Sequence, residues 1–436
     1  MKSPRLTALA WLAILCCLLP RDTLAFQFGA CIHLALSRSN SDAVLKLVDT
    51  AGFNTIRDDF YWSTVEPVQG QLQVPAKFEQ LRLAVEGVKQ RGGTPLLILS
   101  FGNNFYDGGG LVTSEAGIAA FARYAAFVAT TFKGKVEQFE VWNEWNTGFG
   151  SKPKVNHGDA ADYVRLLAAT SKAIHEANPQ ARVIGGVTAG VDFNWINELI
   201  AAGGLAYLDA LSVHSYTLFR FQVNPEGAIR SLDKLHAVLE KAQPGRNLPV
   251  FVTEMGFPTN TGKMGVPEVD VAKYLVRFVM LARTRPWLGG VWWYDLIDDG
   301  NNATLAEHRF GLVAEDQRSK PAFLAASDVS RLVLAGTDFH SYRFGDNGYA
   351  VTGTDPRGRW AVAWTLESTF LAWIDGKTDE PAAPADIAAL GSSVSPRGFP
   401  KLFRFAGGKW APDPAWHDFS GARPQPPGDV RAESGR

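Results

Sequence analysis

Residues 136–146 read VEQFEVWNEWN, and this stretch decides how the chain is expected to fold. Its first six residues have the apolar and aromatic content of a buried β-strand, which ends at the pair Asn143 and Glu144 between two tryptophans. A second strand pattern at residues 250–253 also ends in a glutamate, Glu254. Because the carboxyl ends of parallel strands meet at one edge of a sheet, the two glutamates are predicted to share a site there.

Short strand patterns alternate with amphipathic helical patterns on both sides of this stretch. The strand patterns lie at residues 26–33, 55–58, 95–100, 136–141, 182–186, 210–214, 250–253 and 290–294. The helical patterns lie at residues 42–51, 78–91, 114–132, 159–177, 194–202, 225–242 and 267–283. This alternation predicts an α/β fold, a (β/α)8 TIM barrel over residues 26–326. An open doubly wound sheet is the alternative, but no glycine-rich nucleotide loop follows the first strand.

The pattern changes after about residue 332. Apolar and polar side chains alternate with period two at residues 341–344, 349–352, 360–364 and 402–405, as in strands with one buried face. The sequence Gly-Asp-Asn-Gly at 345–348 is typical of a hairpin turn. We therefore predict a C-terminal antiparallel β-sandwich-like module over residues 327–425, followed by a flexible tail at 426–436.

The N-terminus has the composition of a signal peptide. Lys2 and Arg5 precede an apolar run at residues 6–19, and the small-residue site Thr-Leu-Ala ends at Ala25. We predict that residues 1–25 are cleaved off and that the protein is periplasmic or secreted. The alternative is an uncleaved inner-membrane anchor, although the apolar run is short for a membrane span of about 20 residues.

Composition argues against several classes of function. Lys and Arg number 43 against 44 Asp and Glu, so there is no basic surplus for nucleic-acid binding. No His-Glu-x-x-His tract, Gly-x-Ser-x-Gly elbow or phosphate loop occurs, and we expect no metal and no cofactor. After cleavage Cys31 would be the only cysteine, and it is more simply a small core residue than a nucleophile.

In a (β/α)8 barrel the active site lies at the carboxyl ends of the strands. Glu144 and Glu254 would end the fourth and seventh strands and project into the same mouth. Other polar and aromatic residues fall at or near equivalent strand ends, and these complete the candidate site: His33, Arg57, Trp62, Asn143, His214, Tyr216 and Trp292. Delivery of polar groups by several strands to one mouth indicates a catalytic site more strongly than any single motif does.

These positions also carry a family resemblance. The Asn-Glu pair with Glu254 resembles clan A of the retaining glycoside hydrolases. Within the clan, the motifs HSY at 214–216, WWY at 292–294, RFGL at 309–312 and KPA at 320–322 look most like family 39 and its neighbours. The tracts RDDFYW at 57–62, YDGGG at 106–110 and WNEW at 142–145 are similar to periplasmic exopolysaccharide glycosidases of that kind. The resemblance covers about residues 26–326.

The resemblance implies that Glu144 is the general acid/base and Glu254 the nucleophile, with the two carboxyl groups about 5–5.5 Å apart. The physical chemistry agrees, because an apolar wall of Trp142 or Trp145 would help Glu144 to hold its proton. Glu254 instead needs a cation or donors to stay ionised, and Arg57 and Tyr216 are the candidates. Asn143 would hydrogen-bond the sugar 2-hydroxyl.

Several of these residues have an alternative interpretation. Arg57 could be a structural ion-pair partner, and His33 and His214 could tie loops together at the rim. Trp62 could be a sugar platform or could pack in the core. Trp292 and Trp293 are adjacent on a strand and point to opposite sides, so at least one of them belongs to the core.

Together these observations lead to the hypothesis of an exported retaining glycosidase that cleaves a bacterial exopolysaccharide internally. Its partners would be the polysaccharide and membrane-associated exopolysaccharide export machinery, and we expect a monomer. Two alternatives stay open: an exo-acting enzyme like the xylosidases and iduronidases of the clan, and a non-catalytic polysaccharide-binding protein of an export complex.

Overall fold

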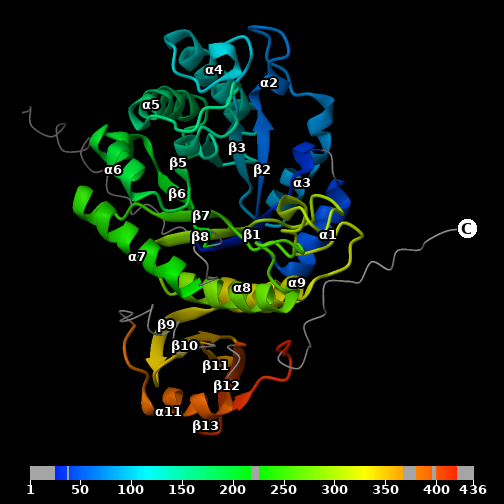
Figure 1. Ribbon diagram of the computed structural model, residues 1–436, viewed down its shortest axis with the longest axis vertical. Coiled ribbons are helices and arrows are strands. Elements are labelled where there is room, and N and C mark those ends of the chain that lie inside the picture. Colours follow the sequence, from blue (N-terminus) through cyan, green and yellow to red (C-terminus); the bar gives the residue numbers. More distant parts are fainter. Residues whose placement is uncertain (1–24, 37–38, 218–224, 367–379, 395–398, 420–436) are drawn as a thin grey trace, which may run out of the picture.

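The computed structural model describes residues 25–36, 39–217, 225–366, 380–394 and 399–419. Within these residues, eight parallel strands form a closed barrel in sequence order (Figure 1). They are β1 (Gln27–Cys31), β2 (Thr55–Tyr61), β3 (Leu96–Ser100), β4 (Gln138–Val141), β5 (Arg182–Ala189), β6 (Ala210–His214), β7 (Val250–Met255) and β8 (Leu288–Trp293). The predicted TIM barrel is therefore confirmed.

Helices surround the barrel. They are α1 (Ser41–Ala51), α2 (Trp62–Val65), α3 (Glu79–Gln90), α4 (Glu115–Thr131), α5 (Ala160–Ala177), α6 (Phe193–Ala201), α7 (Pro225–Ala242), α8 (Glu268–Arg283) and α9 (Pro321–Ala335). Side chains cap the first turn of some of them, as in α1 and α5. The Asn40 side chain accepts from the Ala43 amide at the start of α1, and Gly52 adopts the left-handed conformation at its end. Asp159 caps α5 in the same way as Asn40 caps α1.

Two apolar layers hold the barrel together. The outward faces of the strands and the inward faces of the helices form one continuous core. A separate cluster fills the barrel interior below the mouth: Leu96, Ile98, Ile184, Ala210, Phe251 and Trp292. The Trp292 indole nitrogen donates to the Thr55 hydroxyl at 3.0 Å inside this layer. Because packed side chains fill the barrel interior, the polar groups at the strand ends lie on a rigid apolar layer.

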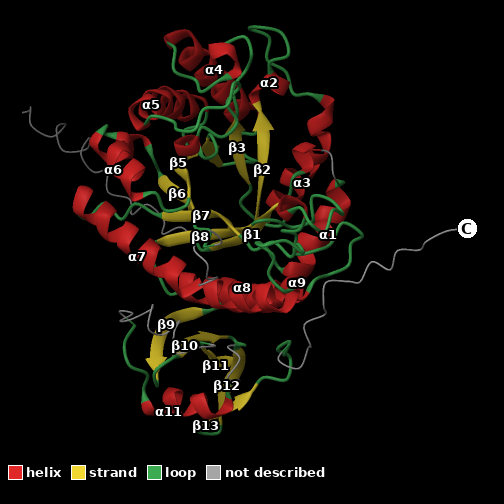
Figure 2. Ribbon diagram, viewed as in Figure 1, coloured by secondary structure: helices red, strands yellow, loops and turns green. Residues whose placement is uncertain are grey.

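The C-terminal module is a five-stranded antiparallel sheet in the order β13-β12-β11-β10-β9. Its strands are β9 (Thr337–Phe344), β10 (Gly348–Asp355), β11 (Gly358–Thr365), β12 (Lys401–Ala406) and β13 (Lys409–Pro412), with the short helix α11 (Ala385–Ala388) beside them. Figure 2 shows this sheet below α8, apart from the barrel. The predicted hairpin turn joins β9 to β10, and the described residues form one sheet of this module.

The barrel and the module are joined by buried polar contacts. Trp364 on β11 donates its indole N–H to Glu226 of α7 at 2.9 Å. Arg285, just after α8, pairs with Glu380 at 2.6 Å. Helix α9 packs on α8 and α1, so it completes the helical layer of the barrel, and the expected domain boundary at residue 326 falls inside it.

Both termini extend beyond the described residues. Residues 1–24 of the predicted signal peptide lie outside them, as does the whole predicted tail at 426–436. In the part of the chain that the structure describes, no helix is both long and apolar enough to cross a membrane.

Candidate active site

A large cavity lies at the carboxyl ends of the barrel strands. Its volume is about 1480 Å³, which exceeds the roughly 300–1,000 Å³ of most small-molecule sites. Its wall includes six of the predicted site residues: His33, Arg57, Asn143, Glu144, Tyr216 and Glu254. The predicted mouth of the barrel is thus a real cavity, and it is large enough for more than one sugar ring.

Glu144 and Glu254 face each other across this cavity. Glu144 follows β4 in the left-handed conformation, with φ of 52°, and its amide donates to the Val187 carbonyl of β5 at 2.8 Å. Glu254 lies at the end of β7 and is 8% exposed. One carboxylate oxygen of each lies within 4.8 Å of the other, with His214 between them. Residues 110 positions apart in the sequence thus form one acidic pair.

His214, at the end of β6, contacts both carboxylates. Its Nδ1 lies 2.8 Å from Glu144 Oε1 and 3.4 Å from Glu254 Oε2. Burial alone would lower the pKa of the imidazole, but the charge of Glu254 and the hydrogen bond and charge of Glu144 outweigh this and raise its pKa above the ordinary value. His214 therefore bridges the two glutamates through Nδ1, whereas its buried Nε2 has no hydrogen-bond partner within the described residues.

Two further donors hold Glu254. Arg57 Nη1 donates to Oε1 at 2.7 Å, and the Tyr216 hydroxyl donates to Oε2 at 2.9 Å. Burial alone would raise the pKa of the Glu254 carboxyl, but the charges of His214 and Arg57 and these hydrogen bonds hold its pKa below the usual value. Glu254 is thus ionised at neutral pH, the state that an attacking carboxylate requires.

Arg57 organises the floor of the site through all of its guanidinium nitrogens. Besides the Glu254 contact, its Nε donates to Glu140 Oε2 at 2.7 Å and its Nη2 donates to Asn143 Oδ1 at 2.9 Å. Arg57 is 2% exposed and Glu140 is fully buried. The residue is therefore both a structural ion-pair partner and a contact of the reacting pair, so the two interpretations of Arg57 hold together.

The Asn143 side chain is oriented by this contact. Because its carbonyl oxygen accepts from Arg57, its amide nitrogen is left to donate toward the cavity that it lines. This is the orientation that a hydrogen bond to a sugar hydroxyl beside Glu144 would need.

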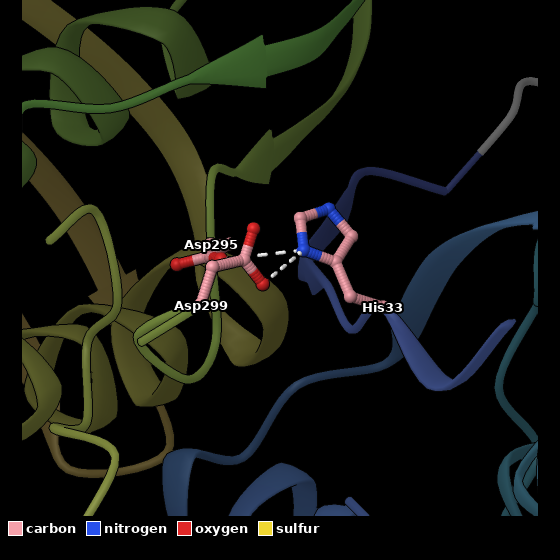
Figure 3. Close-up of side chains that lie close together, drawn as sticks. All are labelled: His33, Asp295 and Asp299. Carbon is pink, nitrogen blue, oxygen red and sulfur yellow. Dashed lines mark hydrogen bonds and ion pairs between the residues drawn. The ribbon is translucent and has the colours of Figure 1, made fainter. Parts of the chain in front are cut away.

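His33 lies in the same cavity but belongs to a different cluster (Figure 3). Its Nδ1 lies 2.9 Å from Asp299 Oδ1 and 3.4 Å from Asp295 Oδ2. Burial would lower the pKa of His33, but the hydrogen bond to Asp299 and the charges of Asp295, Asp299 and Asp58 raise it to about 9. The structure therefore separates His33 from the two glutamates with which the sequence pattern grouped it.

Two groups in the described residues have donor atoms close enough to hold a metal ion. One is Glu144, His214 and Glu254, in which His214 Nδ1 already contacts both carboxylates. The other is the His33 cluster. Cys31 lies beside the first group at 2% exposure, and burial raises the pKa of its thiol well above the ordinary value. It is thus a neutral core residue, as expected.

The predicted aromatic contacts of the site require correction. Trp62 is fully buried, stacks on Tyr106 and donates to Glu66 Oε2 at 2.6 Å, so it does not reach the cavity. Trp292 fills the barrel interior. Both predictions of substrate contact are wrong, because Trp62 begins α2 and packs in the outer core, and because Trp292 belongs to a packed layer inside the barrel.

Trp142 and Trp145 do not form a wall around Glu144 either. Both are fully buried, and they pack edge to face on each other with ring centroids 5.0 Å apart. Their indole nitrogens donate to the carbonyls of Phe149 and Asp159, at 3.0 and 2.9 Å respectively. Neither lines the cavity, so these tryptophans anchor the loop after β4 to the helical layer.

Other aromatic side chains line the cavity and were not predicted: Tyr61, Phe101, Phe149, Phe193, Tyr294 and Phe310. Strand periodicity could have found two of them. Tyr61 lies two and four residues after Asp59 and Arg57, on the same face of β2, and Tyr294 lies two residues above Trp292. The rings of Phe101 and Phe149 come from different loops and contact each other with centroids 5.5 Å apart. No local pattern indicates this contact.

Comparisons with known proteins agree with this architecture. A family model for cellulases, glycosyl hydrolase family 5, matches residues 25–295. A solved family 39 glycoside hydrolase from the gut symbiont Bacteroides cellulosilyticus WH2 is 24% identical, with 89% of this chain and 79% of that chain covered and a TM-score of 0.68. A search of curated proteins found no match.

Two further solved structures are similar. The GH5_18 enzyme from Streptomyces cattleya, in complex with GlcNAc, is 18% identical over 73% of this chain and 82% of that chain, with a TM-score of 0.59. The GH39 enzyme from Xanthomonas axonopodis pv. citri is 16% identical over 89% of this chain and 91% of that chain, with a TM-score of 0.58. At these identities the structures show a shared fold.

Proposed function

The chain belongs to the cellulase family, glycosyl hydrolase family 5, and from this premise we propose that it is an exported retaining glycosidase that cleaves a bacterial exopolysaccharide internally. The resemblance to clan A of the glycoside hydrolases is confirmed. The finer resemblance to family 39 is supported by structural neighbours, whereas the family model is that of family 5.

The separation of the two glutamates carries the proposal of retention. One carboxylate oxygen of Glu144 and one of Glu254 lie within 4.8 Å of each other. An inverting enzyme instead holds its carboxyl groups about 6.5–9.5 Å apart to admit a water between sugar and base. The short separation instead supports direct attack by one carboxylate on the sugar. Glu254 is the attacking group, because Arg57, Tyr216 and His214 keep it ionised.

The reaction then has two steps. The Glu254 carboxylate forms a bond to the anomeric carbon while the glycosidic C–O bond breaks, and Glu144 gives its proton to the departing oxygen. In the second step Glu144 takes a proton from water, the water oxygen attacks the anomeric carbon, and the bond to Glu254 breaks. Asn143 donates to the neighbouring sugar hydroxyl, an interaction that strengthens in the transition state.

Internal cleavage is supported by the size and lining of the cavity. Beyond the glutamates, its lining includes Leu36, Phe149 and Lys234 of α7. A volume of about 1480 Å³ accommodates sugar rings on both sides of the cleaved bond. An exo-acting enzyme would need a cavity that is closed at one end of the path along which the polysaccharide binds. Exo-cleavage by the same two-step mechanism is the alternative.

The aromatic lining gives a prediction about sugar binding. Phe149 is 47% exposed beside the cavity, whereas Trp62 is fully buried. We expect Phe149→Ala to raise KM by about 3- to 10-fold with little change in kcat, since an aromatic contact contributes about 0.5–1.5 kcal/mol. Trp62→Phe, its control, should lower Tm and leave KM unchanged. Steady-state kinetics would contradict the proposal if Trp62→Phe changed KM and Phe149→Ala did not.

The proposed location and partners rest on the N-terminal pattern. A cleaved signal peptide at residues 1–25 would place the enzyme in the periplasm or outside the cell, where exopolysaccharide is available. Contact with membrane-associated export machinery and a monomeric state belong to the same proposal. Mass spectrometry of the mature protein from a bacterial host would detect cleavage after Ala25.

A panel of bacterial polysaccharides tests the function directly. The wild-type protein should convert one of them to oligosaccharides of several sizes, and NMR of the first product should show the anomeric configuration of the substrate retained. Monosaccharide as the only early product would indicate exo-cleavage, and inversion would contradict the mechanism. Tight binding without hydrolysis, equal in wild type and Glu144→Gln, would instead indicate a polysaccharide-binding protein.

A further inference from the structure

The loop that follows β8 places a second cluster of ionisable groups at the rim of the cavity. His33 follows β1, while Asp295 and Asp299 follow β8, and the three side chains converge in Figure 3. The donor atoms of all three lie within 4.8 Å of one another. None of them contacts Glu144 or Glu254 in the hydrogen bonds and ion pairs of the described residues, so the mechanism above does not use the cluster.

Asp295 is the unusual member of the cluster. It is 1% exposed, and within the described residues neither carboxylate oxygen has a hydrogen-bond partner; its one charged contact is His33 Nδ1 at 3.4 Å. A buried carboxylate normally accepts several hydrogen bonds or binds a cation, because desolvation otherwise makes its charged form very costly. The carboxylate points toward His33 and Asp299 (Figure 3), so the missing partner belongs between the three side chains.

We propose that His33, Asp295 and Asp299 bind a divalent cation, Zn²⁺ in preference to Mn²⁺, at the rim of the cavity. One imidazole nitrogen with two carboxylates is a donor set that suits first-row divalent ions, and imidazole favours Zn²⁺. Bonds of about 2.0–2.2 Å to zinc place neighbouring donors about 3–3.5 Å apart. The distances from His33 Nδ1, 2.9 Å to Asp299 and 3.4 Å to Asp295, are close to this spacing.

The electrostatics of the cluster agree with this geometry. Burial and the charges of Asp299 and Asp298 raise the pKa of Asp295 well above its ordinary value, although His33 and Lys320 oppose this. The pKa of Asp58, which faces His33 from β2, is raised to about 7. Burial and mutual repulsion thus disfavour the charged forms of these carboxylates, and a divalent ion would stabilise the ionised forms of Asp295 and Asp299.

Such an ion would tie the loop after β8 to the end of β1. His33 and Asp299 both line the cavity, and three protein ligands leave a coordination position of zinc open. That position would face the substrate, where hydroxyl or carboxylate oxygens of a sugar can bind it. The inference does not rest on the proposed hydrolysis, because the cation should bind in the absence of any polysaccharide.

Titration of the chelator-treated full-length protein with ZnCl2 by calorimetry tests the site. We expect one equivalent to bind, Asp299→Asn and Asp295→Asn to weaken binding at least about tenfold, and MnCl2 to bind more weakly. Affinity should rise with pH, because the ligands must lose their protons to bind the ion. Circular dichroism verifies that both variants fold.

Two control variants locate the binding. His175→Ala removes a histidine that pairs with Asp209 at 3.1 Å on the outside of the barrel, and Glu144→Gln removes a ligand of the other cluster. Both should keep the wild-type affinity for zinc. The proposal is overturned if the wild-type protein binds no zinc, if Asp299→Asn binds it as tightly as wild type, or if Glu144→Gln abolishes binding.

Discussion

Glu254→Gln should lower kcat on the cleaved polysaccharide by about 10⁴-fold or more, the scale on which enzymes lose activity when a covalent nucleophile is removed. The amide is nearly the same size as the carboxylate, but it cannot form the bond to the anomeric carbon. Substrate binding should remain within a few-fold, because Asn143 and the aromatic lining are unchanged. Rates with wild type and variant under saturating substrate measure the effect.

Glu307→Gln is the matched control for this substitution. Glu307 also lines the cavity, but no hydrogen bond or ion pair joins it to Glu254 in the described residues. We expect Glu307→Gln to lower kcat by less than tenfold. A Glu254→Gln enzyme that kept more than a tenth of the wild-type rate, or a Glu307→Gln enzyme that lost as much activity as Glu254→Gln, would contradict the assignment of the nucleophile.

The covalent intermediate gives a second measurement of the same role. In Glu144→Gln the second step lacks its general base, while a substrate with a good leaving group can still complete the first step without an acid. The glycosyl-enzyme should therefore accumulate, and peptide mapping by mass spectrometry should find the sugar on the peptide that contains Glu254. A sugar attached elsewhere would exclude Glu254 as the nucleophile.

Arg57→Ala should cost about 3–5 kcal/mol of stability, because breaking a buried ion pair leaves an uncompensated charge. Its guanidinium is the only charged partner of Glu140 in the described residues, and Glu140 is fully buried. Thermal unfolding followed by circular dichroism should show a large fall in Tm. Combining Arg57→Ala with Glu140→Gln should recover part of the lost Tm. A double variant whose Tm is equal to or lower than that of Arg57→Ala alone would contradict this explanation.

The same substitution should change the pH dependence of catalysis. In the wild type, the pKa of Glu254 lies below its usual value, so activity is retained at neutral pH and is lost as the pH falls through that lowered value. Without the Arg57 charge and hydrogen bond the pKa of Glu254 rises, so the acid limb of the kcat/KM profile should move to higher pH. Arg57→Lys keeps the positive charge but loses the planar guanidinium with its several donors, so it should move the acid limb less.

The strand-end motifs allowed a large part of the site to be predicted. Glu144 and Glu254 end strands that the hydrophobic pattern locates within a few residues, and a parallel barrel has only one place to which both strand ends can point. Asn143, His214 and Tyr216 follow from the same rule, whereas Arg57, predicted at a strand end, is the third residue of β2. The contacts among these residues lie within hydrogen-bonding distance, because rigid strands carry them.

The aromatic residues were harder to predict for a physical reason. Large apolar rings suit a protein core as well as the face of a sugar, and composition does not distinguish the two. Trp62 and Trp292 lie in the core, whereas their neighbours Tyr61 and Tyr294 line the cavity. Trp62 begins the helix that follows β2, and Trp292 lies two residues before Tyr294 in the packed interior of the barrel, so a shift of one or two residues separates core from cavity.

The sequence by itself determined the order of strands and helices, the barrel that follows from it, and the two glutamates at its mouth, because hydrophobic periodicity and strand direction are local properties. The tertiary structure alone decided which charges meet. Only the closed barrel brings Arg57 between Glu140 and Glu254, sets His214 against both catalytic carboxylates, and buries Asp295 beside His33. These contacts join residues that are far apart in the chain, and their energies depend on burial that no local pattern records.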